Sequence, residues 1–272
     1  MLLRVWLTWR RSWKNCSSRW RRCGARCLIA NGKSEGEMSS IKQLTDRLRR
    51  RSIRTVNDGV SDDDLKRLAL VSGSHDVLGE GQHQYHLDAE AGMEQQWQTL
   101  IWPLIKDFDF SVVVDVAAGF GRNSAKLLPY AGQLIVTDIN QKCIDACRQR
   151  FRGQSNVRFI KNDGRSLKEI AAESVTLVYS FDAMVHFDSD IVRAYLREFH
   201  RILKPGGRCF IHHSNDTEQP GGGLVPPHSR NFMSVELFAH YSLKSGLEVT
   251  HQQVIDWGDF KNLDGLTLLR KP

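Results

Sequence analysis

The chain has 272 residues, 41% of them hydrophobic, and a formal net charge of +7. This length allows one large hydrophobic core with an appendage, and no apolar run reaches the roughly 20 residues that a membrane-spanning helix needs. Residues 1–54 carry 15 Lys and Arg against 3 acidic residues, whereas residues 55–272 carry 23 against 28. The positive charge therefore belongs to the N-terminal part and is no argument that the rest binds nucleic acid.

The first 40 residues are basic, with Trp6, Trp9, Trp13 and Trp20 between arginines. Tryptophan next to arginine can stack on nucleic acid bases or lie at a membrane interface, and an Arg-rich, acid-poor start is typical of a transit peptide. We favour a disordered extension, because the segment has little apolar periodicity and ends in a polar, Gly-containing stretch. The run Met38-Ser39-Ser40 resembles the usual first residues of a bacterial protein, which agrees with residues 1–37 being an upstream extension without a folded role.

Residues 41–95 are predicted to be a helical segment in front of the main domain, 96–272. Ser61 followed by three aspartates is typical of a helix N-cap, so a helix is expected from Asp62 to about Val71. A second helix is expected over Glu90–Trp102, with an apolar stripe that suits core packing. The stripe consists of Met93, Trp97, Leu100, Ile101 and Leu104.

A loop rich in glycine and histidine is expected between these two helices. For His83 and His86, an exposed loop position and a substrate contact remain equally open. The loop is expected to contain His75, Gly79, Gly81, His83, Tyr85 and His86.

The most informative run is VVVDVAAGFG at 112–121. Its apolar half, Val112–Val116, is typical of a strand buried on both faces of a parallel sheet, and Gly119 and Gly121 let the backbone approach a ligand closely. The helix expected over Arg122–Leu128 would present its unpaired N–H groups to that ligand. This pattern indicates a nucleotide-binding turn.

Further strands alternate with helices along the chain. Leu134–Thr137 leads into Asp138, which lies 17 residues beyond Gly121 and so near the place of a ribose-binding acid. A third strand, Val157–Ile160, runs into Asp163. The later elements are expected to be a strand at Val175–Ser180, a helix at Ile191–Leu203, a stop at Lys204–Gly207, a strand at Arg208–His212, and two strands at Leu247–Trp257 and Leu263–Leu269 around a turn at Gly258–Asn262.

Two nucleotide chemistries compete for this pattern. A nicotinamide-binding turn has a third glycine where this chain has Ser124, and Asp115 just before the glycines would repel a pyrophosphate. The same acid suits a ligand with an ammonium and a sulfonium group. The run Asp115–Arg122 resembles the first motif of class I S-adenosylmethionine-dependent methyltransferases of the bacterial, small-molecule type, with Ala117 where that family more often has glycine. The resemblance covers roughly Trp97–Pro272.

The resemblance implies an α/β fold, namely a Rossmann-like, seven-stranded, mostly parallel sheet with helices on both faces and an antiparallel C-terminal strand. It also implies S-adenosyl-L-methionine as cofactor, with Asp138 on the ribose hydroxyls, and Ile139 and Asp163 near the adenine. Segment 41–95 would form a lid. The expected cofactor-binding residues are Asp115, Ala117, Gly119, Gly121, Asp138, Ile139, Asp163, Gly164 and Phe181.

Methyl transfer needs a base only when the acceptor must lose a proton. The candidates follow the fourth and fifth strands, where ligands bind in open α/β sheets. His186 is the first choice, because neutral imidazole accepts a proton near neutral pH, and Asp182 and His212 complete the expected catalytic set. A structural role for each histidine is the alternative. No metal is expected, although hard oxygen ligands could hold Mg²⁺ here; these are Asp182, Asn215 and Asp216.

The class of methyl acceptor is indicated mainly by a motif that the sequence does not contain. Family members that methylate an exocyclic base amine or a glutamine amide usually have an Asn/Asp-Pro-Pro-aromatic motif after the fourth strand, where this chain has Ser180–Ala183. We therefore expect a small-molecule or sugar acceptor, methylated on a hydroxyl oxygen, and no nucleic acid partner for the catalytic domain. The alternative from another class is a non-catalytic adenosyl-binding protein or an RNA-associated scaffold.

Six cysteines are scattered along the chain, and Cys143 and Cys147 lie one helical turn apart. This pair could hold a metal, but no second pair has matching spacing, so buried thiols are expected. This cysteine usage suits a reducing cytoplasm.

Overall fold

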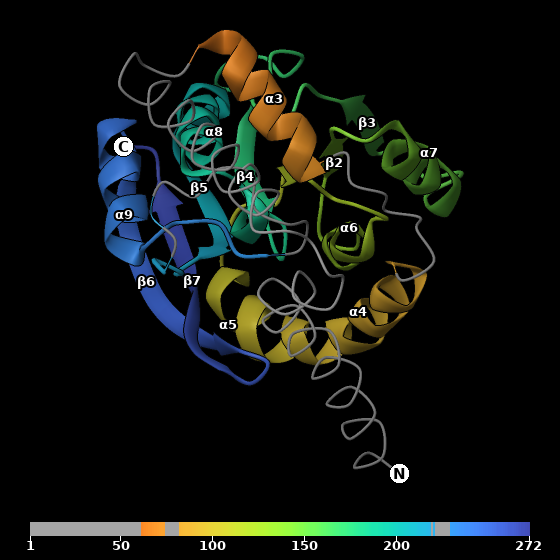
Figure 1. Ribbon diagram of the computed structural model, residues 1–272. Helices are drawn as coiled ribbons and strands as arrows, with labels where there is room; N and C mark the ends of the chain where they lie inside the picture. The colour runs from red at the N-terminus through yellow and green to blue at the C-terminus, as the bar shows by residue number, and fades with distance from the viewer. Residues whose placement is uncertain (1–60, 74–81, 219, 221–228) are drawn as a thin grey trace. The chain divides into compact units, whose positions relative to one another are not determined.

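The computed structural model describes residues 61–73, 82–218, 220 and 229–272 (Figure 1). The chain divides after Gly59, and all described residues belong to its second unit, Val60–Pro272. The expected tail at 1–40, together with His75, Gly79 and Gly81 of the predicted loop, lies outside the described residues. The domain boundaries at 40 and 95 stay predictions.

A seven-stranded sheet forms the centre of this unit, with the strand order β3-β2-β1-β4-β5-β7-β6. The pairs from β3 to β5 are parallel, whereas β7 is antiparallel to both of its neighbours. The predicted fold class is confirmed. The strands are β1 (Val112–Val116), β2 (Gln133–Asp138), β3 (Val157–Lys161), β4 (Val175–Ser180), β5 (Leu203–Ser214), β6 (Glu248–Trp257) and β7 (Phe260–Arg270).

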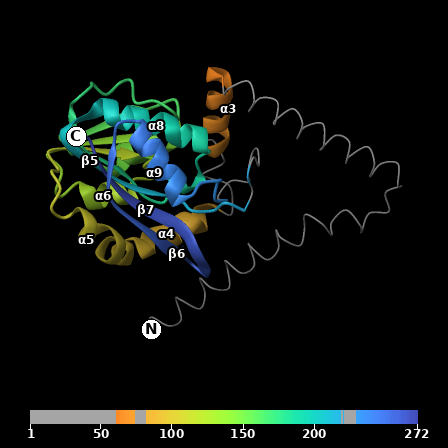
Figure 2. The same ribbon diagram turned by 90° about the vertical axis from the view of Figure 1, so that its left-hand side faces the viewer.

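Helices cover both faces of the sheet (Figure 2). Successive side chains of a strand point to opposite faces of the sheet, so apolar residues along β1 require helices on both faces. Val114 packs in a core cluster with α3, α8 and α9, whereas Val113 packs in a second cluster with α4, η1, α5, α6 and α7. The helices are α3 (Asp62–Gly73), α4 (Gln82–Gln96), a π-helical turn η1 (Trp97–Ile101), α5 (Trp102–Ile105), α6 (Arg122–Leu127), α7 (Gln141–Arg150), a 3₁₀ turn η2 (Met184–His186), α8 (Ser189–Ile202) and α9 (Val235–Lys244).

The helix expected to begin at Glu90 begins at Gln82 instead, so the predicted loop is wrong over 82–89 and His83, Tyr85 and His86 lie in α4. Ion pairs from Glu90 to Arg150 and from Glu94 to Lys126 fix α4 against α7 and α6. The helix propensity of residues such as Gln82, Leu87 and Ala89 favours continuing this anchored helix back to Gln82 despite the loop-like composition. The predicted apolar stripe is confirmed as core, because Met93, Trp97 and Ile101 are buried.

Two boundaries near the C-terminus also differ from the prediction. β5 begins at Leu203 rather than after the glycines, because the backbone of Gly206 and Gly207 bonds to Lys271, a long-range contact that a local stop signal does not reveal. The last hairpin turns over Gly258 and Asp259 rather than over five residues, and β7 already begins at Phe260. Gly258 has a φ of 60°, which permits so tight a turn.

Among the described residues, no helix is long and apolar enough to cross a membrane.

Candidate active site

The loop after β1 reverses direction through left-handed residues. Gly119 has a φ of 56° and Gly121 a φ of 79°, and Ala117 adopts a φ of 57° without being glycine. A Cβ on Gly119 would meet nothing within 4 Å, whereas one on Gly121 would lie 2.8 Å from Phe151 Cε2 and 3.1 Å from Cys147 Sγ. Glycine is therefore needed at these two positions for different reasons. At Gly119 it borders open space, and at Gly121 it permits close packing on α7.

This difference predicts losses of stability of different size for two matched variants. Gly121→Ala is expected to lower the free energy of unfolding by about 2–3 kcal/mol, because left-handed strain and a steric clash add. Gly119→Ala is expected to cost about 1 kcal/mol, since only the strain applies. Thermal unfolding of both variants checks this, and equal losses of stability would contradict it.

Two acids lie beneath this loop. Asp138, at the end of β2, is 6% exposed, and its carboxylate accepts hydrogen bonds from Gly119 N at 2.9 Å and Asn140 N at 2.7 Å. Burial raises the pKa of Asp138 to about 6, although these hydrogen bonds by themselves would lower it. Asp115 is 1% exposed and accepts a hydrogen bond from Ser124 Oγ at 2.6 Å. Burial raises its pKa to about 7, against the hydrogen bond from Ser124.

The raised pKa of Asp115 predicts a pH-dependent stability. The folded protein keeps a proton that the unfolded chain releases above its ordinary pKa of 3.8. The stability that this group contributes is full below that value and is lost as the pH rises through about 7, by about 4 kcal/mol in total. Asp115→Asn removes this titration but keeps an acceptor for Ser124. Its melting temperature near pH 8 should exceed that of the wild type.

Melting curves from about pH 5 to pH 9 test this prediction, with the exposed Asp145→Asn as the matched control. If Asp115→Asn shows the same pH dependence as the wild type, the carboxyl group is not buried as described.

The loop after β3 packs against α3. A Cβ on Gly164 would lie 2.5 Å from Ile139 Cδ1 and 2.8 Å from Ala69 Cβ, so Gly164 allows α3 and Ile139 to meet. Arg165 also forms an ion pair with Asp62 of α3. Asp163 accepts hydrogen bonds within its own loop, from Arg165 N and from the N–H and hydroxyl of Ser166. The loop is thereby ordered next to a buried part of α3.

Phe181, expected at the cofactor, turns its ring into the core. The ring is 3% exposed and lies 4.7 Å from the imidazole of His212 and 5.9 Å from the indole of Trp257, between ring centroids. Its carbonyl oxygen accepts a hydrogen bond from Asn123 Nδ2. The structure places Phe181 behind the strand ends as packing.

Asp182 follows β4 in a left-handed conformation, with a φ of 57°. Its carboxylate pairs with Arg122 at the start of α6, and its backbone N–H donates to Nδ1 of His212 at 3.1 Å. Burial alone would raise the pKa of Asp182, but the positive charge of Arg122 holds it below its ordinary value. Arg122 also donates to the carbonyl of Ala89 in α4. These contacts join the glycine loop, β4 and β5 at one edge of the sheet.

His212 on β5 is fully buried, and both ring nitrogens are engaged within the protein. Because Nδ1 accepts from Asp182 N, Nε2 carries the proton and donates to Asp264 Oδ2 at 3.0 Å. Asp264 lies on β7 and also accepts from Nε of Arg230 at 2.9 Å and from its Nη2 at 2.6 Å. Burial alone would raise the pKa of Asp264, but the bonds from His212 and Arg230 hold it at about 2. Arg230 further lies over the Trp257 ring at 5.5 Å.

His186 closes the 3₁₀ turn η2 after β4. Its Nδ1 lies 2.9 Å from the carbonyl oxygen of Ser229, and a carbonyl only accepts, so Nδ1 carries the proton. In the neutral ring, Nε2 is then the nitrogen that can take up a proton.

The structure brings Asp182 and His212 into direct contact, and His186 lies four residues after Asp182 in the same loop, while the catalytic role of all three stays a prediction. The sequence prediction missed three residues that hold them there, namely Arg122, Arg230 and Asp264. His213 next to them is fully buried and stacks on Phe238 at 3.8 Å, and burial lowers its pKa to about 3. It is a core residue rather than a proton acceptor at neutral pH.

Metal binding finds no support in the part of the chain that the structure describes, where no cluster of three His, Cys, Asp or Glu side chains could hold an ion. Asn215, a possible magnesium ligand, uses its side chain to bond Asn262 O and Val235 N. Cys143 and Cys147 are buried free thiols, as expected, and burial raises the pKa of both.

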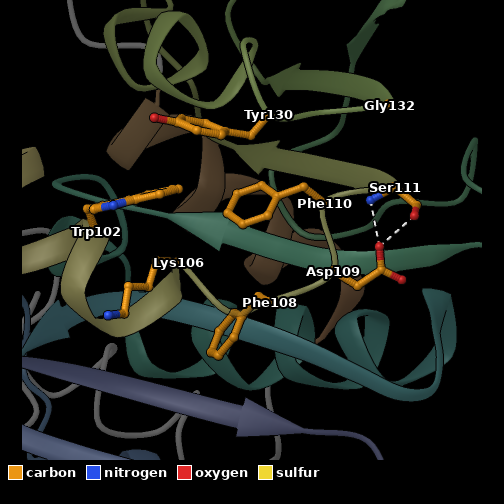
Figure 3. A pocket seen from close by; sticks show the side chains of 8 residues that line it. All are labelled: Trp102, Lys106, Phe108, Asp109, Phe110, Ser111, Tyr130 and Gly132. Atoms are coloured by element: carbon orange, nitrogen blue, oxygen red, sulfur yellow. Dashed lines mark hydrogen bonds between the residues drawn. The ribbon is translucent and has the colours of Figure 1, made fainter.

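An open hollow of about 470 Å³ lies at the opposite edge of the sheet, where β1 and β2 begin (Figure 3). Trp102 and Tyr130 stack across it at 4.4 Å, and Asp109 accepts hydrogen bonds from Ser111 N and Oγ. It is separate from the loops at the carboxyl ends of the strands, where an α/β sheet binds its ligands.

Residues 113–207 match the family model described as "Methyltransferase domain". Over 148 residues the chain is 25% identical to the demethylmenaquinone methyltransferase of Clavibacter sepedonicus, covering 54% of this chain and 58% of that protein. Over 128 residues it is 30% identical to a ubiquinone/menaquinone biosynthesis C-methyltransferase of Pseudomonas putida, covering 44% and 48%. The chain thus aligns with about half the length of these curated relatives.

A solved S-adenosylmethionine-dependent methyltransferase from Mesorhizobium loti shares the fold, with a TM-score of 0.54 and 17% identity, over 66% of this chain and all of that one. Three findings point to the same kind of fold. They are the sheet order with its antiparallel β7, the glycine loop after β1 and the match to the methyltransferase domain. Residues 113–207 thus match a methyltransferase domain, and the described part of the chain has the fold of the solved S-adenosylmethionine-dependent methyltransferase.

Proposed function

We propose that this protein binds S-adenosylmethionine at the glycine loop and transfers its methyl group to a small-molecule acceptor, on a hydroxyl oxygen. The match of residues 113–207 to a methyltransferase domain supports this cofactor. The observation that carries the proposal is the space beside Gly119, where an added Cβ would meet nothing within 4 Å, directly above the buried carboxylate of Asp138.

The residues at this loop fit the cofactor chemically. One carboxylate oxygen of Asp138 accepts the backbone N–H of Gly119 and the other that of Asn140, and a carboxylate has further lone pairs that can accept a ribose hydroxyl. Asp115 supplies a second carboxyl group near the loop for a cationic ligand. Ile139, which is partly exposed and packs on Gly164, offers an apolar contact for the adenine, and Asp163 lies in the loop beside it. Ala117 and Gly121 shape the loop, and Phe181 packs behind it.

On the acceptor side, His186 serves as the base. Nε2 of His186 takes the proton of the acceptor hydroxyl while the oxygen forms its bond to the methyl carbon. Bound S-adenosylmethionine supplies that methyl group from its sulfonium, which leaves as a neutral thioether with the electron pair of the broken bond. Asp182 and His212 orient the loop that carries His186 rather than exchange protons themselves, since both are held by hydrogen bonds within the protein.

A carbon acceptor is a second candidate, because one curated relative is named a demethylmenaquinone methyltransferase and another a ubiquinone/menaquinone biosynthesis C-methyltransferase. Removing the proton of a phenolic hydroxyl places negative charge on the oxygen and on ring carbons beside it. One base therefore serves both outcomes, and the geometry of the bound acceptor decides which atom is methylated.

A screen with radiolabelled methyl donor separates these candidates. Purified full-length protein is incubated with simple phenols, reduced quinones and sugars, and the product is analysed for O–CH₃ or C–CH₃. The proposal predicts label in at least one small-molecule class. Tight binding of the cofactor with no transfer to any class, and a tail that binds RNA, would favour a non-catalytic scaffold.

A further inference from the structure

Asp264 lies outside the region that matches the methyltransferase model, yet it contacts the candidate site from two directions. It sits on β7, where its backbone pairs with that of Ser214 at the end of β5, and its side chain is fully buried. It accepts N–H donors from His212 and Arg230. A buried carboxylate is stable only when such donors compensate it.

The contact through His212 leads to the start of the loop after β4. With Nε2–H fixed on Asp264, Nδ1 of His212 remains an acceptor and holds the backbone N–H of Asp182. Asp182 needs this support, because a left-handed conformation is strained for a residue other than glycine. Asp264 thus sets which nitrogen of His212 faces the loop.

The contact through Arg230 leads to the end of the same loop. Arg230 lies between two residues that bond to η2: Ser229 O accepts from His186 Nδ1 at 2.9 Å, and Asn231 N donates to Val185 O at 3.1 Å. The guanidinium of Arg230 meets both carboxylate oxygens of Asp264. Such a two-point contact fixes direction as well as distance.

We infer that Asp264 is a positioning residue that holds the loop 182–186 at both ends, at Asp182 through His212 and at His186 through Arg230 and Ser229. The inference rests on the proposed function in one respect, namely that His186 is the base. Asp264 itself touches no reacting atom. It fixes the tautomers of two histidines and thereby leaves Nε2 of His186 as the proton acceptor.

Replacing Asp264 by asparagine is the sharpest change, because the side chain keeps its size. An amide has one oxygen in place of two and turns an NH₂ group toward the N–H groups of His212 or Arg230. One of these contacts must be lost. Asp256→Asn on the same hairpin is the matched control, since it weakens an exposed ion pair with Lys261.

The test records imidazole ¹⁵N spectra of the full-length protein, which distinguish protonated from unprotonated ring nitrogens. In the wild type and in Asp256→Asn we expect His186 with its proton on Nδ1 and His212 with its proton on Nε2. In Asp264→Asn we expect at least one histidine to lose its single tautomer. A folded Asp264→Asn protein with both tautomers unchanged overturns the inference.

Arg230→Gln keeps the test decisive if Asp264→Asn does not fold. It removes the ion pair with Asp264 that leads to His186 and keeps the Asp264 carboxylate for His212, so His186 should lose its fixed tautomer while His212 keeps its own. An unchanged His186 overturns the inference. Titration with S-adenosylhomocysteine runs in parallel. Failure of the wild type to bind it would refute the proposed function, whereas the spectra decide the role of Asp264 independently.

Discussion

His186→Asn is expected to lower turnover by about 10²- to 10⁴-fold, the contribution typical of a positioned general base. Asparagine can still donate a hydrogen bond to Ser229 O, so the loop after β4 should keep its shape. What the variant lacks is a nitrogen that takes up a proton. Steady-state kinetics with the acceptor found in the methyl screen measure this loss, which should fall on kcat rather than on the KM for S-adenosylmethionine.

The pH dependence of the wild-type rate provides the control. If His186 removes a proton, the rate should rise over the range in which histidine side chains become neutral, about pH 6 to 7. The variant should lack this rise. Near-normal turnover of His186→Asn, together with a flat wild-type profile, would make His186 structural.

Asp138→Ala is expected to weaken binding of S-adenosylhomocysteine by about 2–3 kcal/mol, the range for hydrogen bonds to a charged group. It should also lower the free energy of unfolding, because Gly119 N and Asn140 N lose their acceptor. Calorimetric titration gives the affinity, and thermal unfolding shows how much folded protein remains.

Asp138→Asn separates these two effects, since its amide oxygen can still accept one of the backbone N–H bonds. It should recover part of the stability but not the affinity for the ribose hydroxyls. If a well-folded Asp138→Ala binds the ligand as tightly as the wild type does, the ribose lies elsewhere.

Much of the fold follows from local patterns. The strands β1 and β4 have the predicted boundaries, because a run of buried apolar residues bounded by polar or small ones is a local signal. The amphipathic helix α8 agrees within two residues at its start, where Asp188 accepts a hydrogen bond from Asp190 N as its N-cap. Elements defined by distant contacts were the ones predicted wrongly. The beginning of β5 depends on backbone bonds to Lys271, and α4, whose first eight residues were predicted as a loop, is held by contacts of Ala89, Glu90 and Glu94 with α6 and α7.

The residues of the candidate site likewise fall into two groups, those indicated by local sequence patterns and those placed by distant contacts. Asp138 and the glycines follow directly from their spacing along the chain. Arg230 and Asp264 do not, because they reach His212 only through the antiparallel pairing of β5 with β7. One local signal could have indicated Asp264: an acid followed by glycine within the mostly apolar run Leu263–Leu269. Gly265 is required there, since an added Cβ would lie 2.6 Å from Cε1 of His213.

The central claim is that the glycine loop binds S-adenosylmethionine. The most direct measurement is calorimetric titration of the full-length protein with S-adenosylhomocysteine and, separately, with NAD. The account predicts saturable binding of S-adenosylhomocysteine, weakened in Asp138→Ala and in Gly119→Ala, and no useful affinity for NAD. Binding of NAD with no response to S-adenosylhomocysteine would contradict it.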